Sequence, residues 1–335
     1  MKIFVTGATG FIGGHVVRQL RERGDDVKAL VRAPAKAQDL AALGVELAPG
    51  AIDDRDHLAR AMLGSDAVIH GAAIYEVGIP AGRRRALDKA NVDGTRNVLG
   101  AALDAAIDRV VYISTVGAFG NTHGEVVDET YEHPGVEFTS HYEKTKYEAH
   151  RVALAMIAAG LDCVIVQPTA VFGPDDHSAL GKQVLDFARG RMPVVPFPEL
   201  GLNMVHVEDV AAGIVAALDK GRPGEAYVLG SQNTTMRGLM DTVADVAGKR
   251  KPLANVPTFL LKSIAPLGPL IGRVAGQPPN MHELISASDG VTLWASHEKA
   301  ARDLGYEPRP LSDGLRQTLV AEGVLPGSGT ASATS

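Results

Sequence analysis

A chain of 335 residues is long enough for one large α/β domain and a smaller lobe. Charged residues make up 21% of the chain and the formal net charge is −6, so no nucleic-acid partner is expected. Cys163 is the single cysteine, which excludes an internal disulfide. Its apolar surroundings predict a core residue in a protein of the reducing cytoplasm.

The first thirteen residues join a short apolar run to three glycines. The run is too short for a helix and predicts a buried parallel strand, and a helix is expected to begin near Phe11. A strand that turns through glycines into a helix N-terminus offers free N–H groups and a positive dipole end. Because the short apolar run leads directly into glycines, it is not expected to be a signal peptide. The glycine-rich start predicts a pyrophosphate site that comprises Gly7, Thr9, Gly10, Phe11, Ile12 and Gly13.

These glycines are spaced three apart, unlike the usual Gly-x-Gly-x-x-Gly fingerprint. The stretch 6–13 resembles the cofactor loop of the extended short-chain dehydrogenase/reductases, which include the NAD-dependent epimerase/dehydratases. The chain looks most similar to the dihydroflavonol-reductase-like and hopanoid-associated epimerase-like members. The resemblance implies an α/β fold with a Rossmann-type doubly wound parallel sheet, a smaller C-terminal substrate-binding lobe and a nicotinamide cofactor.

The second predicted strand, residues 27–31, ends at Arg32. In a Rossmann fold the residue at this position faces the adenosine ribose, where a carboxylate selects NAD. Arg32, with Lys36 four residues later, would instead attract the additional phosphate of NADP. NADP is therefore the preferred cofactor and NAD the alternative; two solvated basic side chains are the structural alternative.

The next strands predict contacts with the rest of the dinucleotide. A third strand at 45–47 and a helix at 55–63 flank Ile52 and Asp53, whose backbone and carboxylate are the candidates for adenine contacts. A fourth strand at 67–70 ends at His70, which is interpreted as a core histidine. The resemblance implies that the small residues after it let the cofactor backbone pass; they are Gly71, Ala72 and Ala73.

Two further segments precede the fifth strand. The run 83–85 consists of three arginines and is interpreted as a solvated loop or helix start, with an acidic substrate as the alternative. The stretch 91–98 resembles the Asn-Val-x-Gly-Thr helix of the family. The resemblance implies that Asn91 lies beside the cofactor.

Residues 109–115 predict the fifth strand, which ends in two hydroxyl residues. The resemblance, aligned on Gly120, implies that Thr115 is the catalytic hydroxyl residue, with Ser114 as the alternative. In this role Thr115 would hydrogen-bond the substrate oxygen.

A helix is expected over 139–159, with Ser140 as its cap. Tyr142 and Lys146 are four residues apart and therefore share one face of it. Hydride transfer to a carbonyl needs a proton donor for the developing alkoxide, and Tyr142 is the candidate acid/base. Lys146 is expected to lower the pKa of Tyr142 and to anchor the nicotinamide ribose.

The sixth strand, 162–167, leads into a stretch that resembles the Arg-Pro-x-x-Val-Tyr-Gly-Pro motif of the family. The resemblance implies that Pro168 and Val171 pack on the nicotinamide. Farther along, Asp209 is expected to cap a helix over 210–219. His206, Glu208 and Asp209 could be misread as a metal site. No metal is expected, because a strand-to-helix junction should direct them to different sides.

The alternation of strand and helix breaks down after residue 175. Helices are expected at 178–190 and 236–247, a strand at 226–229 and a proline-rich loop at 192–198. The apolar, proline-broken segment 256–275 could wall or cover a pocket, and no stable membrane insertion is expected. The predicted division is a cofactor-binding core at 1–175, a mostly substrate-binding region at 176–326 and a disordered tail at 327–335.

These predictions together favour an NADP-dependent oxidoreductase that reduces a ketone or aldehyde of a small, fairly apolar substrate. One alternative is a sugar-nucleotide epimerase or dehydratase that holds NAD(P) tightly. Another is a non-catalytic NADP-sensing protein, against which the Tyr142 and Lys146 pair argues. The substrate and its stereochemistry stay open, as does the oligomeric state, for which a homodimer is one option.

Overall fold

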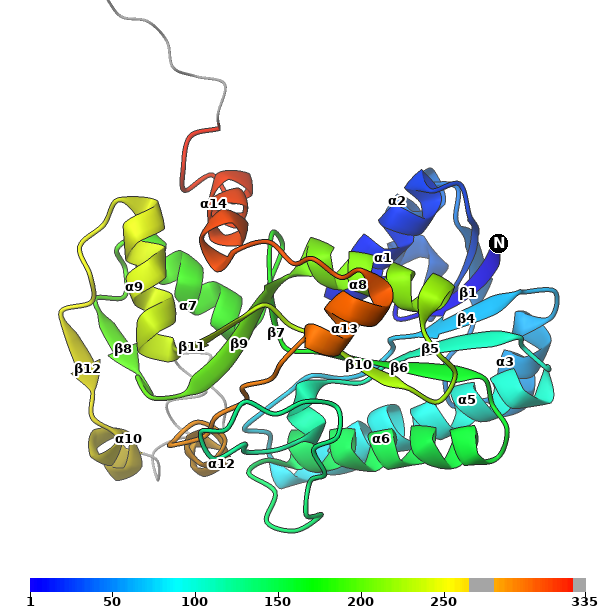
Figure 1. The fold of residues 1–335 in the computed structure, drawn as a ribbon, viewed down its shortest axis with the longest axis horizontal. Helices are drawn as coiled ribbons and strands as arrows, with labels where there is room; N and C mark the ends of the chain where they lie inside the picture. The colour runs from blue at the N-terminus through cyan, green and yellow to red at the C-terminus, as the bar shows by residue number, and fades with distance from the viewer. Residues whose placement is uncertain (265–279, 328–335) are drawn as a thin grey trace, which may run out of the picture.

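The computed structural model describes residues 1–264 and 280–327. A twisted parallel sheet lies at its centre with helices on both faces, and a smaller region of sheet and helices lies at one side (Figure 1). Among the described residues, no helix is long and apolar enough to cross a membrane.

The central sheet has seven strands in the order β10-β6-β5-β4-β1-β2-β3, and all its pairings are parallel. Its strands are β1 (Lys2–Thr6), β2 (Asp26–Val31), β3 (Glu46–Pro49), β4 (Ala67–His70), β5 (Arg109–Ile113), β6 (Cys163–Pro168) and β10 (Ala226–Leu229). The chain runs outward from β1 in one direction and then from β4 in the other. This reversal is the switch point at which doubly wound sheets bind dinucleotides. The predicted fold class is confirmed.

Helices cover both faces of this sheet, so its strands are buried on both sides. This explains why their sequences are continuous apolar runs. Leu20, Ile214 and Leu304 belong to the core of one face, and Leu58, Leu99 and Ala149 to that of the other. The first layer holds α1 (Phe11–Glu22), α2 (Gln38–Ala42), α8 (Val207–Lys220) and α13 (Glu298–Leu304). The second holds α3 (Arg55–Met62), α5 (Gly94–Asp104) and α6 (His141–Ala158).

The smaller region contains a three-stranded and a two-stranded sheet. The first has the order β11-β9-β7, and in the second β12 pairs with β8. Their strands are β7 (Ala170–Phe172), β8 (Val194–Pro196), β9 (Gly201–His206), β11 (Gln232–Thr235) and β12 (Ala254–Val256). Three helices pack with them, namely α7 (Ala179–Ala188), α9 (Met236–Ala247) and α14 (Leu311–Ala321). The prediction of a loop at 192–198 is wrong, because 194–196 pair in parallel with β12.

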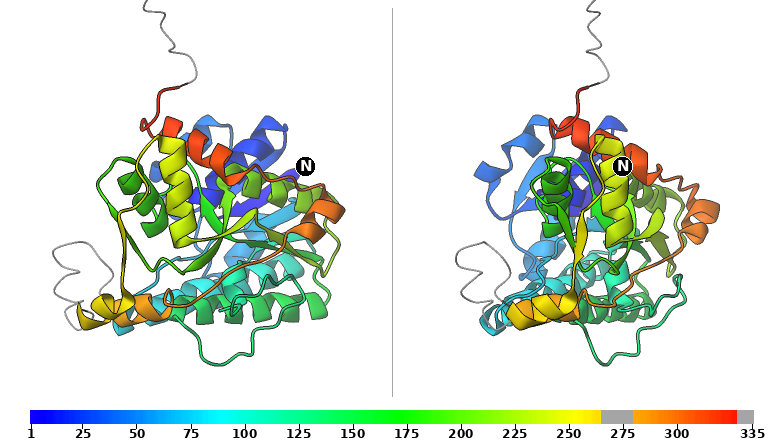
Figure 2. Two further views of the ribbon diagram at one scale, coloured as in Figure 1. Left: turned by 60° about the vertical axis from the view of Figure 1, so that its left-hand side comes forward. Right: turned by 90° about the vertical axis from the view of Figure 1, so that its left-hand side faces the viewer.

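Short elements complete the described chain. They are η1 (Pro34–Lys36), η2 (Ala81–Arg83), α4 (Arg84–Asp88), the π-helix η3 (Lys89–Asp93), η4 (Val116–Ala118), α10 (Thr258–Ile264) and α12 (Met281–Ser286). Helices α10 and α12 contact one another and lie side by side in Figures 1 and 2. The segment 256–275 is described only as far as α10. The predicted tail is described only at residue 327, and 328–335 lie outside the described residues.

One predicted helix cap is confirmed and another is wrong. Ser140 caps α6, since its hydroxyl accepts a hydrogen bond from the Glu143 amide at 3.1 Å. Asp209 does not cap α8, because the helix begins at Val207 and His206 occupies the cap position. Asp209 lies inside the first turn, and its carboxylate binds a side chain from a distant part of the sequence, described below.

Candidate active site

The glycine loop between β1 and α1 is built by close approaches of backbone to backbone. Gly7 has a φ of +82°, and a Cβ on it would lie 2.6 Å from the carbonyl carbon of Gly71. A Cβ on Gly13 would lie 2.1 Å from the carbonyl oxygen of Gly7. Only glycine fits at either position. Gly10 caps α1 without a side-chain hydrogen bond, so the amides of the first turn stay available to a pyrophosphate.

The small residues 71–73 follow β4 beside the end of β1. The Gly71 amide donates to the Thr6 carbonyl at 3.1 Å, which holds this segment against the glycine loop. His70 bonds the hydroxyls of Thr6 at 2.7 Å and Thr95 at 3.2 Å. Burial lowers the pKa of His70 to about 3, so its ring is neutral. The prediction that His70 is a core histidine is confirmed.

The residues predicted at the adenosine end lie on the surface. Arg32 follows β2 directly and Lys36 ends η1; both are exposed. Neither forms an ion pair with another described residue. Asp53 pairs with Lys89 at 2.9 Å. The Ile52 carbonyl accepts a hydrogen bond from the side-chain amide of Asn97 on α5. Two basic side chains without partners at the end of β2 suit an added phosphate.

The predicted catalytic hydroxyl, Thr115, lies between β5 and η4. It accepts a hydrogen bond from the Gly117 amide at 3.1 Å and donates one to the Pro168 carbonyl at 3.2 Å. A Cβ on Gly117 would lie 3.5 Å from the Thr115 oxygen and 3.9 Å from Cε1 of Tyr142. Gly117 therefore lies between the hydroxyl and the ring. The structure brings Thr115, Tyr142 and Pro168 together at the end of β6.

Ser114, the alternative to Thr115, has a different environment. Its side chain is buried, and its hydroxyl lies 3.1 Å from Nδ1 of His150 on α6. Successive side chains of an extended segment point to opposite sides. The Ser114 and Thr115 hydroxyls therefore point to different sides, and the catalytic role of Thr115 stays a prediction.

Tyr142 and Lys146 lie one turn apart on α6. Lys146 is only 4% exposed, and its Nζ lies 5.8 Å from the centroid of the Tyr112 ring. Burial lowers the pKa of Lys146 to about 8. Burial also raises the pKa of Tyr142, with smaller contributions from Tyr75 and Tyr112. The expectation that Lys146 lowers the pKa of Tyr142 is thus wrong for the chain by itself, in which burial of the phenol dominates.

Asn91 lies on the π-helix η3, and its amide is fully engaged. Its Oδ1 accepts from the Ile74 amide at 2.8 Å, and its Nδ2 donates to the Ile74 carbonyl and to the Thr145 hydroxyl, both at 3.0 Å. The predicted contact of Asn91 with the cofactor stays a prediction. Its hydrogen bonds join the loop after β4 to the turn of α6 that carries Tyr142.

Tyr75 was not predicted from the sequence. It directly follows Ile74, whose amide and carbonyl are bonded by Asn91. The ring of Tyr75 lies edge-on to that of Tyr142, with centroids 4.8 Å apart and planes at 89°. An aromatic residue a few positions beyond the strand that ends at His70 was the available signal. It was too weak to identify the residue without the fold.

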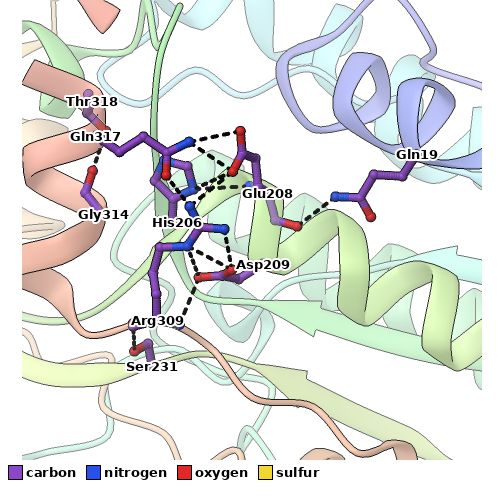
Figure 3. Close-up of polar contacts among 9 residues, drawn as sticks. All are labelled: Gln19, His206, Glu208, Asp209, Ser231, Arg309, Gly314, Gln317 and Thr318. Atoms are coloured by element: carbon purple, nitrogen blue, oxygen red, sulfur yellow. Dashed lines mark hydrogen bonds and ion pairs between the residues drawn. The ribbon is translucent and has the colours of Figure 1, made fainter. Parts of the chain in front are cut away.

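A polar network joins the smaller region to α8 (Figure 3). Arg309 donates to both carboxylate oxygens of Asp209 at 2.9 Å and to Glu208 at 3.0 Å. His206 and Glu208 are also close, at 3.9 Å. The expectation that these acidic residues point to different sides is wrong, because they converge on Arg309. The guanidinium bridges the two carboxylates and offsets one of their two negative charges, and no metal is needed to hold them together.

The network reaches the cofactor helix as well. The Glu208 carbonyl accepts a hydrogen bond from Gln19 of α1 at 3.0 Å, and the Glu208 carboxylate binds Gln317 of α14 (Figure 3). Sequence reasoning missed Arg309, since nothing near it in the chain indicates a partner 100 residues away. The network ties α1, α8 and α14 to one another, and its members lie outside the Thr115 and Tyr142 cluster.

Known proteins share these features over most of the chain. Residues 3–230 match the model of the NAD dependent epimerase/dehydratase family. A Synechocystis protein provisionally named a dihydroflavonol 4-reductase is 34% identical over 93% of this chain and 92% of its own. A ketoreductase from Stigmatella aurantiaca, whose named substrate is a farnesyl dihydroquinoline oxide, is 31% identical over 97% and 99% of the two chains.

A solved structure has the same architecture. The dTDP-glucose 4,6-dehydratase DesIV from Streptomyces venezuelae, solved with NAD bound, superimposes with a TM-score of 0.76. It is 27% identical and covers 96% of this chain and 97% of its own. Together with the glycine loop and the doubly wound sheet, these matches show that the chain belongs to the NAD dependent epimerase/dehydratase family, and that it is an NAD(P)-dependent enzyme of the extended short-chain dehydrogenase/reductase type.

Proposed function

We propose that the protein reduces the carbonyl of a small, fairly apolar ketone or aldehyde with NADPH. The observation that carries this proposal is the cluster of Thr115, Tyr142 and Lys146 beside Pro168. A phenol, a hydroxyl and a buried ammonium on neighbouring elements are the groups that reduction of a carbonyl by a nicotinamide would use. The glycine loop suits a dinucleotide, because the backbone approaches at Gly7 and Gly13 leave no room for side chains.

The protein's own groups perform the proton chemistry. NADPH, when bound, supplies the hydride that the carbonyl carbon accepts. Tyr142 donates its phenolic proton to the oxygen that becomes negative, since a tyrosine phenol is protonated near neutrality. Thr115 hydrogen-bonds the same oxygen, which competes with the Pro168 carbonyl for the hydroxyl proton. Lys146 would hold the nicotinamide ribose.

The preference for NADP over NAD is supported by Arg32 and Lys36. Titration of both cofactors by protein fluorescence should show tighter binding of NADP. Arg32→Asp should weaken NADP binding by about 1–3 kcal/mol, because it removes a charge-assisted bond and adds repulsion. Arg60→Asp, an exposed change on α3, is the matched control and should have no effect. Equal or tighter binding of NAD by the wild type contradicts the preference.

Sugar-nucleotide epimerisation or dehydration is the competing function. It draws support from the likeness to DesIV, a dTDP-glucose 4,6-dehydratase. Carbonyl reduction is favoured by the Stigmatella aurantiaca relative, a ketoreductase whose named substrate carries a farnesyl chain. Two arginines of the C-terminal half are also occupied, and so less suited to grip a diphosphate. Arg237 binds Asp241 and Arg309 binds Asp209.

The test is a screen of ketones and aldehydes by the loss of NADPH absorbance, with thermal protection by nucleotide sugars measured in parallel. The proposal expects turnover of at least one apolar aryl, steroid or flavonoid-type carbonyl compound. Protection by nucleotide sugars without protection or turnover by these ketones would replace carbonyl reduction with the competing function.

A further inference from the structure

Tyr75 is a large aromatic side chain that stands beside the proton donor and is still mostly accessible. Its side chain is 64% exposed, although its ring packs edge-on against Tyr142 with centroids 4.8 Å apart. One flank of the Tyr75 ring is covered by Tyr142, and most of the remaining surface of the residue is accessible.

Asp176 is a second charged or polar residue close enough to act on Tyr75. Surrounding protein raises the pKa of the Tyr75 phenol, and the carboxylate of Asp176, which is only 7% exposed, raises it further.

The position of Tyr75 is fixed through the residue before it. Asn91 bonds both the amide and the carbonyl of Ile74, at 2.8 and 3.0 Å. The side-chain nitrogen Nδ2 of Asn91 also donates to the Thr145 hydroxyl, which in turn donates to the Tyr142 carbonyl at 2.8 Å. The chain of bonds therefore sets Tyr75 relative to the turn that presents Tyr142. It starts on a π-helix, a rare element that occurs frequently at functional sites.

We propose that Tyr75 is a specificity-determining residue that selects carbonyl compounds with a flat, aromatic or conjugated group next to the carbonyl, and that Asn91 is the positioning residue for it. This inference rests on the proposed function, in which the carbonyl oxygen meets Tyr142. The group beside the carbonyl carbon then lies along the open ring of Tyr75. Aromatic groups gain from offset or edge-on packing beyond the area they bury, whereas a saturated group gains only burial.

The test compares two ketones that share one ten-carbon bicyclic skeleton, 1-tetralone with an aromatic ring and 1-decalone without one. Binding to the full chain saturated with NADP⁺, in which neither ketone can be reduced, is measured by equilibrium dialysis. The wild type should bind 1-tetralone more tightly. Tyr75→Leu should lower this preference about three- to tenfold, the size of an aromatic pair's extra stabilisation, and Tyr75→Phe should keep it.

Tyr131→Leu is the matched control, because Tyr131 makes an edge-on contact with Phe119 instead of with Tyr142. It should leave the preference unchanged. The inference is overturned if Tyr75→Leu keeps the wild-type preference, or if the wild type does not bind 1-tetralone more tightly than 1-decalone. Turnover with NADPH is measured separately. Tyr75-dependent binding without turnover of either ketone contradicts carbonyl reduction alone, and turnover without Tyr75-dependent preference contradicts this inference alone.

Asn91→Ala tests the positioning role. The preference for 1-tetralone should fall as in Tyr75→Leu, and any turnover should show a larger rise in KM than fall in kcat. Thr145→Val, which removes the second link of the chain, should have a smaller effect in the same direction and serves if Asn91→Ala does not fold. A fall in melting temperature with unchanged preference in both variants would show that Asn91 is only structural.

Discussion

The two halves of the enzyme place their functional groups in different ways. The dinucleotide side depends on backbone contacts, such as the 2.1 Å that would separate a Cβ on Gly13 from the Gly7 carbonyl oxygen. The C-terminal side depends on side chains from distant segments, such as Arg309 on Asp209. A backbone contact tolerates no side chain at one position, whereas an ion pair needs two particular residues. The first half is therefore readable from local sequence, and the second is not.

The largest expected effect lies on the dinucleotide side, at the proposed proton donor. Tyr142→Phe keeps the ring and removes the proton that the alkoxide would need. Turnover should fall by about 10²–10⁴, the usual loss for a general acid. Cofactor affinity should change little, because the glycine loop and the end of β2, which are proposed to hold the pyrophosphate and the adenosine, are unaltered. Turnover on any substrate from the screen, with cofactor binding measured in parallel, decides the matter. Near-normal turnover would remove Tyr142 from the mechanism.

The backbone side of the comparison is tested by two neighbouring glycines of α1. Gly13→Ala should cost about 1–3 kcal/mol of stability or more and weaken cofactor binding, since the new methyl would overlap the Gly7 carbonyl. Gly14→Ala is the control, because its Cβ would lie 3.7 Å from the nearest backbone oxygen, an ordinary contact. Thermal melting and NADP titration measure both effects. Equal behaviour of the two variants would refute the close-approach argument.

The side-chain half is tested at Arg309. Arg309→Met should lower the free energy of unfolding by about 1–3 kcal/mol, because it leaves the mostly buried Asp209 carboxylate without its partner. Cofactor affinity should be nearly unchanged, since the glycine loop does not use this guanidinium. Arg96→Met, which breaks an exposed ion pair with Asp93, should cost less than about 0.5 kcal/mol. Urea denaturation compares the two. A similar cost for both would show that the network contributes little.

The parallel sheet could be predicted because each of its strands is a short apolar run followed by a turn signal. The smaller region could not be predicted as well. The strand 194–196 lies among prolines, and its partner β12 is a distant segment. Asp209 matched a helix-cap pattern, but its partner was 100 residues away. In the candidate site, motif and spacing predict Thr115, Tyr142 and Lys146, and their catalytic roles stay predictions. Tyr75 belongs to no motif and became visible only through its contact with Tyr142.

A further effect of similar size concerns Lys146, which is proposed to act in catalysis and is not expected to be needed for folding. Its ammonium is buried without a carboxylate partner among the described residues, and burial lowers its pKa from 10.5 to about 8. The protonated lysine is therefore less favourable in the folded state than in the unfolded state, which lowers the free energy of unfolding. Lys146→Met keeps the length of the side chain and removes the charge. It should therefore raise the free energy of unfolding at pH 7 by about 1–3 kcal/mol while turnover falls.

The sign of the pH dependence follows from the lowered pKa. Below pH 8 both states carry the charge, so the folded protein bears the full cost and Lys146→Met gains most. Between pH 8 and 10.5 the unfolded chain binds more protons, so the wild type gains stability with rising pH and the advantage of the variant shrinks. Lys144→Met, at a half-buried position of α6 paired with Glu148, should show no such gain. Denaturation at pH 7 and pH 10 measures the difference, and a variant no more stable than the wild type at pH 7 would mean that the ammonium is solvated or paired after all.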